Sequence, residues 1–144
     1  MIVLGGTKMT IIDGLIRSEA DGSLSFGNYS LPHKSKVSDF EHEGDLYKVK
    51  THKEVTKLEK NGMFVYESVP GTTVTNFKAA DVTCFKVEGF EDAQVTLELE
   101  AETEYKITVN GNDIGTMKTN LGGKLMFSLE LDEGVQTDVN IEKI

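Results

Sequence analysis

Four glutamates recur at every second position in the second half of the chain, and carboxylates in such a row could hold a cation. They are Glu98, Glu100, Glu102 and Glu104. On one continuous strand they would project from one face, while Val95, Leu97 and Leu99 would project from the other. Calcium needs about six to eight converging oxygens, and side chains about 7 Å apart along a strand do not converge. We therefore expect a solvated acidic face that discourages strand pairing, with a divalent cation site or a surface for a basic partner as the alternative.

Histidine and cysteine are the other residues that could bind a metal or act as nucleophiles. His33, His42 and His52 lie in a polar, lysine-rich region without metal-ligand spacing, and we expect them on the surface. The single cysteine, Cys84, lies in a strand-like run and is expected to pack as a small apolar residue. We assign no catalytic, cofactor-binding or metal-binding residue, and we expect no cofactor.

Glycan chemistry is a further possibility to consider. The sequence contains no P-loop, no GxGxxG motif and no GxSxG motif. A glycoside hydrolase needs two carboxyl groups in one cleft, and a sequence with 24 acidic residues does not locate such a pair. Sugar binding commonly uses flat aromatic side chains. The chain has no tryptophan, so a platform would depend on its four tyrosines, Tyr29, Tyr47, Tyr66 and Tyr105. Tyr105 shares the strand parity of Ile107 and is expected in the core.

Composition indicates an ordinary globular protein, with 38% hydrophobic and 27% charged residues in 144 positions. No apolar run is long enough to span a membrane, and residues 1–8 do not resemble a secretory signal. We therefore expect no membrane partner and a cytoplasmic location, with non-conventional export as an alternative.

The net charge of −9 belongs entirely to the second part of the chain. Residues 1–87 hold 11 acidic and 11 basic side chains, whereas residues 88–144 hold 13 acidic and 4 basic ones. An acidic protein without a positive patch repels the phosphate backbone. Nucleic acid is therefore not an expected partner.

Two Asn-Gly pairs between runs of alternating polarity predict tight β-hairpins, at Asn61-Gly62 and Asn110-Gly111. Residues 45–52 form a further alternating run, typical of a strand. The period of two places one set of side chains in a shared core: Tyr105, Ile107, Val109, Leu125, Phe127 and Leu129. A weak helix over 11–20, and a helical first flank over 55–60, are the alternatives to strands there.

These patterns predict an all-β protein. Residues 1–70 are expected to form an N-terminal β-meander lobe, beginning with a short apolar strand at 2–4 that could dock on another subunit. After the breaker Val69-Pro70-Gly71, residues 71–144 contain seven short runs at the spacing of an immunoglobulin-like or jelly-roll β-sandwich. One continuous domain is the alternative to two lobes.

Three segments carry a resemblance to a known family: SEADGSLSFGNY, KVSDFEHEGDLYKVKTHKEVTKLEKNGMFVYESVPGT and MKTNLGGKLMFSLEL. With them, nearly the whole chain resembles small proteins of Clostridia and related Firmicutes that are grouped under the name endosialidase. The name implies hydrolysis of sialic acid polymers. Sialidases hold the substrate carboxylate with clustered arginines, and this chain has one arginine, Arg17. One chain therefore cannot assemble such a site, and no catalytic residue follows from the resemblance.

The sequence thus favours a non-enzymatic β protein that associates with itself, as a homo-oligomer or filament, in a structural, scaffolding or interaction role. Its many short strands leave sheet edges to be covered. A carbohydrate-binding module is the alternative, supported by the sandwich pattern alone. A glycan hydrolase, as the family name implies, is the third hypothesis.

Overall fold

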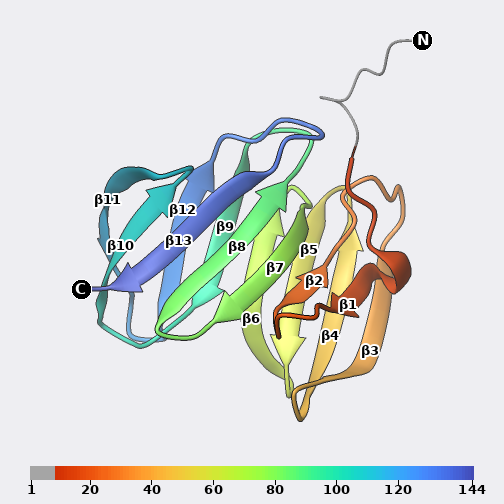
Figure 1. Ribbon diagram of the computed structural model, residues 1–144, viewed down its shortest axis with the longest axis horizontal. Coiled ribbons are helices and arrows are strands. Elements are labelled where there is room, and N and C mark those ends of the chain that lie inside the picture. The colour runs from red at the N-terminus through yellow and green to blue at the C-terminus, as the bar shows by residue number, and fades with distance from the viewer. Residues whose placement is uncertain (1–8) are drawn as a thin grey trace.

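The computed structural model describes residues 9–144 and is an antiparallel β-sandwich (Figure 1). No α-helix occurs in these residues, and the only helical element is a 3-10 turn, η2 (Asp13–Leu15). The predicted all-β sandwich is confirmed. The predicted strand at 2–4 lies outside the described residues.

Two sheets form the layers of the sandwich. The seven-stranded sheet has the spatial order β1 (Ile16–Ser18), β2 (Leu24–Phe26), β7 (Thr73–Ala79), β8 (Val82–Glu88), β13 (Thr137–Lys143), β10 (Glu104–Val109) and β11 (Asn112–Lys118). The six-stranded sheet has the order β12 (Lys124–Leu129), β9 (Ala93–Glu98), β6 (Met63–Val69), β5 (Val55–Lys60), β4 (Asp45–His52) and β3 (Ser35–His42).

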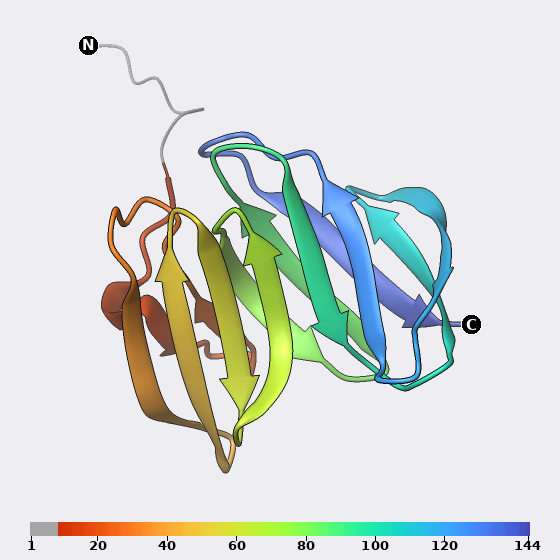
Figure 2. The ribbon, with the colours of Figure 1, turned by 180° about the vertical axis from the view of Figure 1, so that it is seen from behind.

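Strands β3 to β6 form a meander within one sheet, after which the chain repeatedly passes between the two layers (Figures 1 and 2). The connection from β6 to β7 contains the Val69-Pro70-Gly71 breaker, with a cis Val69–Pro70 peptide bond. Strands from both sides of residue 70 pair in each sheet, β2 with β7 in one and β6 with β9 in the other. One hydrophobic core cluster runs between the layers.

Both predicted hairpins are confirmed. Asn61 and Gly62 have φ values of 51° and 79°, and Asn110 and Gly111 have values of 50° and 81°. Two successive left-handed residues match the twist of the flanking strands, which is why Asn-Gly is favoured there. The helical alternatives over 11–20 and 55–60 are wrong, because these segments contain η2 and β1 in the first case and β5 in the second.

The predicted core parity is also confirmed. Tyr105 and Ile107 of β10 are buried, and Leu125, Phe127 and Leu129 of β12 are buried in the facing sheet. Val109 is partly buried and packs against the same core. Alternation along each strand therefore assigned these side chains to the interior correctly.

A buried network of hydroxyl groups holds the β6–β7 connection between the sheets. The hydroxyl of Thr72 bonds to Tyr66 Oη at 2.8 Å and to Ser68 Oγ at 2.7 Å. The hydroxyl of Thr56 donates to the Thr72 carbonyl at 2.8 Å and accepts from the Thr72 N–H at 3.0 Å. Thr51 Oγ1 continues the network at 2.8 Å from Thr56 Oγ1 and accepts the Asn28 N–H at 2.8 Å. Every hydroxyl in it is therefore paired inside the core.

Two glycines allow the backbone to approach this network. Gly27 has φ of 94°, and a Cβ there would lie 2.5 Å from the Thr72 carbonyl oxygen. A Cβ at Gly71 would overlap the His52 carbonyl oxygen. A side chain at either position would force the backbone apart, so glycine is required for the close packing.

We predict that Thr72→Val destabilises the protein by about 1–3 kcal/mol, because it leaves the buried Tyr66 and Ser68 hydroxyls without a partner. The matched control is Thr73→Val, since Thr73 Oγ1 is buried with no hydrogen-bond partner among the described residues. The control should leave stability unchanged or raised. Urea denaturation followed by tyrosine fluorescence measures both. Equal losses in the two variants would show that the network contributes nothing specific.

Candidate functional site

The acidic row does not lie on one strand, so the expected acidic face is wrong. Strand β9 ends at Glu98, and β10 begins at Glu104 in the opposite sheet. Glu100 and Glu102 lie in the connection, where Glu102 has φ of 50°. Two members are paired with lysines: Glu98 with Lys124 at 2.5 Å, and Glu100 with Lys143 at 2.6 Å. Residues 9–144 contain no group of three or more His, Cys, Asp or Glu side chains that could hold a metal ion.

One histidine also departs from the prediction. His33 is exposed and His52 is half-buried, but His42 is buried. His42 Nδ1 lies 2.7 Å from Ser18 Oγ, and His42 Nε2 lies 3.1 Å from the Gly22 carbonyl oxygen. These contacts tie the end of β3 to β1 and to the β1–β2 turn, which explains why a polar side chain is enclosed there.

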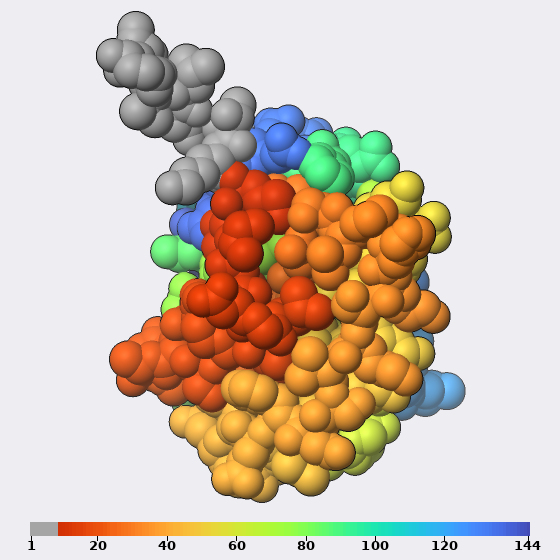
Figure 3. Space-filling model, turned by 90° about the vertical axis from the view of Figure 1, so that its right-hand side faces the viewer, coloured from red at the N-terminus to blue at the C-terminus, as the bar shows by residue number. Residues whose placement is uncertain are grey.

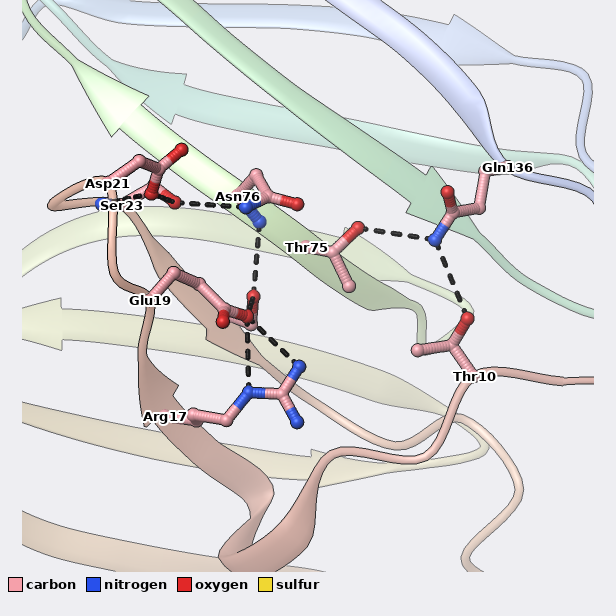
Figure 4. Close-up of polar contacts among 9 residues, drawn as sticks. Thr10, Arg17, Glu19, Asp21, Ser23, Thr75, Asn76 and Gln136 are labelled. Atoms are coloured by element: carbon pink, nitrogen blue, oxygen red, sulfur yellow. Dashed lines mark hydrogen bonds and ion pairs between the residues drawn. The ribbon is translucent and has the colours of Figure 1, made fainter.

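A polar network covers the outer face of the seven-stranded sheet where β1, β2 and β7 meet (Figure 4). Glu19 Oε2 accepts hydrogen bonds from Arg17 Nε at 3.1 Å and Nη2 at 2.9 Å, and from Ser25 Oγ at 2.5 Å. The backbone N–H of Asn76 donates to Ser25 Oγ, and its side-chain amide donates to Ser23 Oγ, each at 3.1 Å. We call this set of side chains the Arg17 network.

A bulge in β7 makes these contacts possible. Asn76 has φ of 55°, and the register with β8 shifts between Thr75 and Lys78. A β-bulge redirects the backbone of one strand, and here the redirected Asn76 reaches Ser25 of β2 and Ser23, which comes just before β2. Asparagine tolerates the left-handed conformation better than most residues.

Within the Arg17 network, the positive charge of Arg17 is balanced by the negative charge of Glu19. The Ser25 hydroxyl and the Arg17 guanidinium lower the pKa of Glu19, so this carboxylate is charged at neutral pH. The Ser23 hydroxyl and N–H likewise lower the pKa of Asp21. The only arginine of the chain is thus already paired with a carboxylate. Its guanidinium is therefore not available to bind the carboxylate of a sugar acid through two parallel hydrogen bonds.

A buried carboxylate, Glu88, was missed by the sequence analysis. It is 1% exposed, and it accepts the Thr10 N–H at 3.0 Å and the Tyr29 hydroxyl at 3.3 Å. Burial and the charge of Glu88 raise the pKa of Tyr29 to about 12, so its hydroxyl remains a donor. Gln136 adds contacts to Thr10 and Thr75 nearby (Figure 4). These contacts hold Thr10, and with it the segment before β1, against the sandwich. No sequence motif indicates them.

Two hollows open between the ends of the sheets. One has a volume of about 460 Å³ and is lined by His42, Asp45, Tyr47, Lys60 and Phe77 among others. Lys60 and Asp45 pair across it at 3.4 Å. The other has a volume of about 860 Å³, and Tyr105, Glu100 and Lys143 are among its lining residues. Glu100 and Lys143 form an ion pair there at 2.6 Å. Neither hollow presents an unpaired catalytic constellation among the described residues.

The tyrosines do not form a sugar-binding platform. Tyr29, Tyr66 and Tyr105 are buried, and Tyr47 is half-buried. A polar hollow of about 260 Å³ lies on the outer face of the seven-stranded sheet, with Asn76, Lys78 and Asp138 in its lining. No tyrosine lies among its lining residues.

The edge strands at the two ends of the sandwich differ in how they are covered. At one end, β1 and η2 contact the edge strand β3 across the layers, and their residues pack side by side (Figure 3). At the other end lie β11 and β12, the last strands of the two sheets (Figure 1). Every residue of β11 is exposed. Four large apolar side chains are exposed along this β11–β12 edge: Ile114, Met117, Leu121 and Met126.

No family model, curated protein or solved structure matches the chain. Within residues 9–144, no helix is long and apolar enough to cross a membrane.

We predict that Glu19→Gln lowers the free energy of unfolding at neutral pH by up to about 1 kcal/mol. An ion pair between partly exposed side chains, such as Arg17 and Glu19, rarely stabilises a protein by more than this. The folded-state pKa of Glu19 lies below its ordinary value of 4.5. Its contribution is therefore complete above that value and is lost as the pH falls through the folded-state pKa. The variant should lose less stability than the wild type between about pH 5 and pH 3.

The control is Glu41→Gln on β3, because the Glu41 side chain is exposed and its carboxylate makes no hydrogen bond or ion pair with another described residue. Thermal unfolding at several pH values compares the two variants. Identical pH profiles for Glu19→Gln and the wild type would show that the Arg17 network does not stabilise the charged carboxylate.

Proposed function

We propose that the chain is a non-enzymatic β protein that associates with copies of itself and serves a structural, scaffolding or interaction role. The observation that carries this proposal is the β11–β12 edge. Natural sheet edges are usually shortened, charged, bulged or covered. Strand β11 is bulged where it pairs with β10, but this edge also exposes Ile114, Met117 and Met126. Large apolar side chains exposed together resemble an interaction surface.

The state of the polar groups supports a non-enzymatic role. The Arg17 guanidinium, the Glu88 carboxylate and the His42 imidazole each have partners that hold a neighbouring segment in place. A catalytic acid, base or nucleophile needs a position from which it reaches a substrate. Cys84, the only cysteine, is free and half-buried, which fits the expected cytoplasmic location.

Carbohydrate binding is the weaker alternative. The polar hollow beside Asn76 offers hydrogen-bonding groups, but the tyrosines that could form a stacking surface are turned into the core. The hydrolase implied by the endosialidase resemblance has still less support, since Arg17 is held by Glu19. The oligomeric role accounts for the exposed apolar side chains of the β11–β12 edge, which neither alternative explains.

We expect sedimentation velocity or mass photometry to show a dimer or a larger closed assembly at roughly micromolar concentration. The species should dissociate on dilution, as a reversible assembly does. A filament is the expected product if the contact does not close on itself. A monomer throughout the accessible concentration range would overturn the proposed function.

A further inference from the structure

We propose that residues 2–4 dock in an apolar hollow beside Phe90 on the same molecule. These residues precede the part of the chain that the structure describes. The inference does not depend on the proposed self-association, because no residue of the β11–β12 edge lines this hollow. It is carried by the exposed apolar lining of the hollow, by the position of Thr10 and by the composition of residues 1–8.

The hollow lies where the outer face of the six-stranded sheet meets one end of the sandwich, and its volume is about 770 Å³. The apolar part of its lining is formed by Val55, Val69, Pro70 and Phe90. Thr56 and Ser68 are buried in the interior, so the residues next to them, Val55 and Val69, point to the outer face. Val69 is 54% exposed and Phe90 is 51% exposed. Large apolar side chains exposed together indicate a surface that another segment covers.

Hydrogen bonds and aromatic packing hold the walls of this hollow in place. The Gly71 N–H donates to the Lys53 carbonyl at 3.0 Å, which joins the β6–β7 connection to the β4–β5 turn. The Phe90 ring packs edge-to-face with the buried Tyr29 ring, with 4.8 Å between the ring centres. The hollow is therefore formed before a segment enters it, which lowers the entropic cost of docking.

The described part of the chain begins near this hollow. The Thr10 N–H donates to Glu88 at 3.0 Å, and Glu88 is two residues from Phe90. The β4–β5 turn and the β8–β9 loop lie at the same end of the sandwich as Thr10 (Figure 2). Residue 3 is seven positions before Thr10, and seven extended residues span about 23–25 Å. Because packed sheets lie about 10 Å apart, this length is enough to cross the end of the sandwich to the hollow.

The composition of residues 1–8, MIVLGGTK, suits this hollow. Residues 2–4 are Ile-Val-Leu, and their docking removes apolar surface from water on both sides of the contact. The Gly5-Gly6 pair adopts positive φ values without strain, so the chain can turn toward the hollow. A short tether gives residues 2–4 an effective concentration of the order of millimolar at their own hollow. Docking within one molecule is therefore favoured over docking on a second copy at micromolar concentration.

Disulfide cross-linking tests the docking in a Cys84→Ala background, since Cys84 is the only cysteine. The double variant Val3→Cys/Val69→Cys should form a disulfide within one molecule on mild oxidation. The matched control is Val3→Cys/Val135→Cys, because Val135 is 47% exposed and lies next to Gln136, which contacts Thr10, but does not line the hollow. A segment without a docking site would reach both positions, so we expect the first variant to oxidise at least about tenfold faster. Peptide mass mapping without reduction identifies the disulfide.

Fluorescence provides a second test that requires no oxidation. The chain has no tryptophan, so Phe90→Trp introduces a single reporter in the wall of the hollow. Docked residues would shield this reporter from a soluble quencher. Adding Val3→Asp places a charge in the apolar contact and should raise the acrylamide quenching constant about twofold. Adding Thr7→Asp introduces the same charge at a polar position of the same segment and should leave the constant unchanged. Circular dichroism confirms that each variant is folded.

The outcomes separate this inference from the proposed function. A disulfide within one molecule, together with quenching that rises in Val3→Asp alone, would support the docking whether the wild type is a monomer or an oligomer. Equal oxidation of the two cysteine pairs, or equal quenching in all variants, would overturn it. A disulfide between two copies would also overturn it, and would show that residues 2–4 dock on another subunit.

Discussion

The hydroxyl of Thr72 lies where the chain leaves the six-stranded sheet and enters the seven-stranded one. At this point the backbone must pass through the interior, where unpaired polar groups are costly. Thr56, Tyr66 and Ser68 supply the partners, and all are fully buried. Because one set of hydroxyls bridges the end of the meander and the start of β7, the spacing of the two layers depends on this network remaining complete.

The same requirement explains the positions of the other enclosed polar groups. His42 ties the end of β3 to β1, and Glu88 holds the segment before β1 through Thr10. The Arg17 network joins β1 and β2 to the bulge of β7. In each case the side chain joins segments that are distant in sequence. Polar residues that resemble catalytic groups by type are thus committed to structure by their partners.

Those contacts are concentrated toward one end of the sandwich and make its two ends unequal. The end that contains β1 and β3 is closed by η2 and by the side chains around His42. The end that contains β11 and β12 has no such cover among the described residues, and its apolar side chains face solvent. Self-association through this end would give the exposed edge the hydrogen bonds that every interior strand already has.

The sequence by itself determined the local structure of this protein. Alternating polarity identified the inward side chains of β10 and β12, and the Asn-Gly pairs identified two hairpins, because both signals depend only on neighbouring residues. The same alternation misread Glu98 to Glu104, since a period of two also continues through a turn between sheets. It could not foresee the burial of His42 or Glu88, whose partners lie far away along the chain.

Only the tertiary structure decided which strands became neighbours and which remained at an edge. A strand's pattern of polarity states which face is buried, but it does not state which strand lies beside it. The bulges of β3 and β7 and the uninterrupted pairing of β12 follow from contacts between distant segments. The candidate interface was therefore invisible in the sequence, because an edge is a property of the assembled sheet.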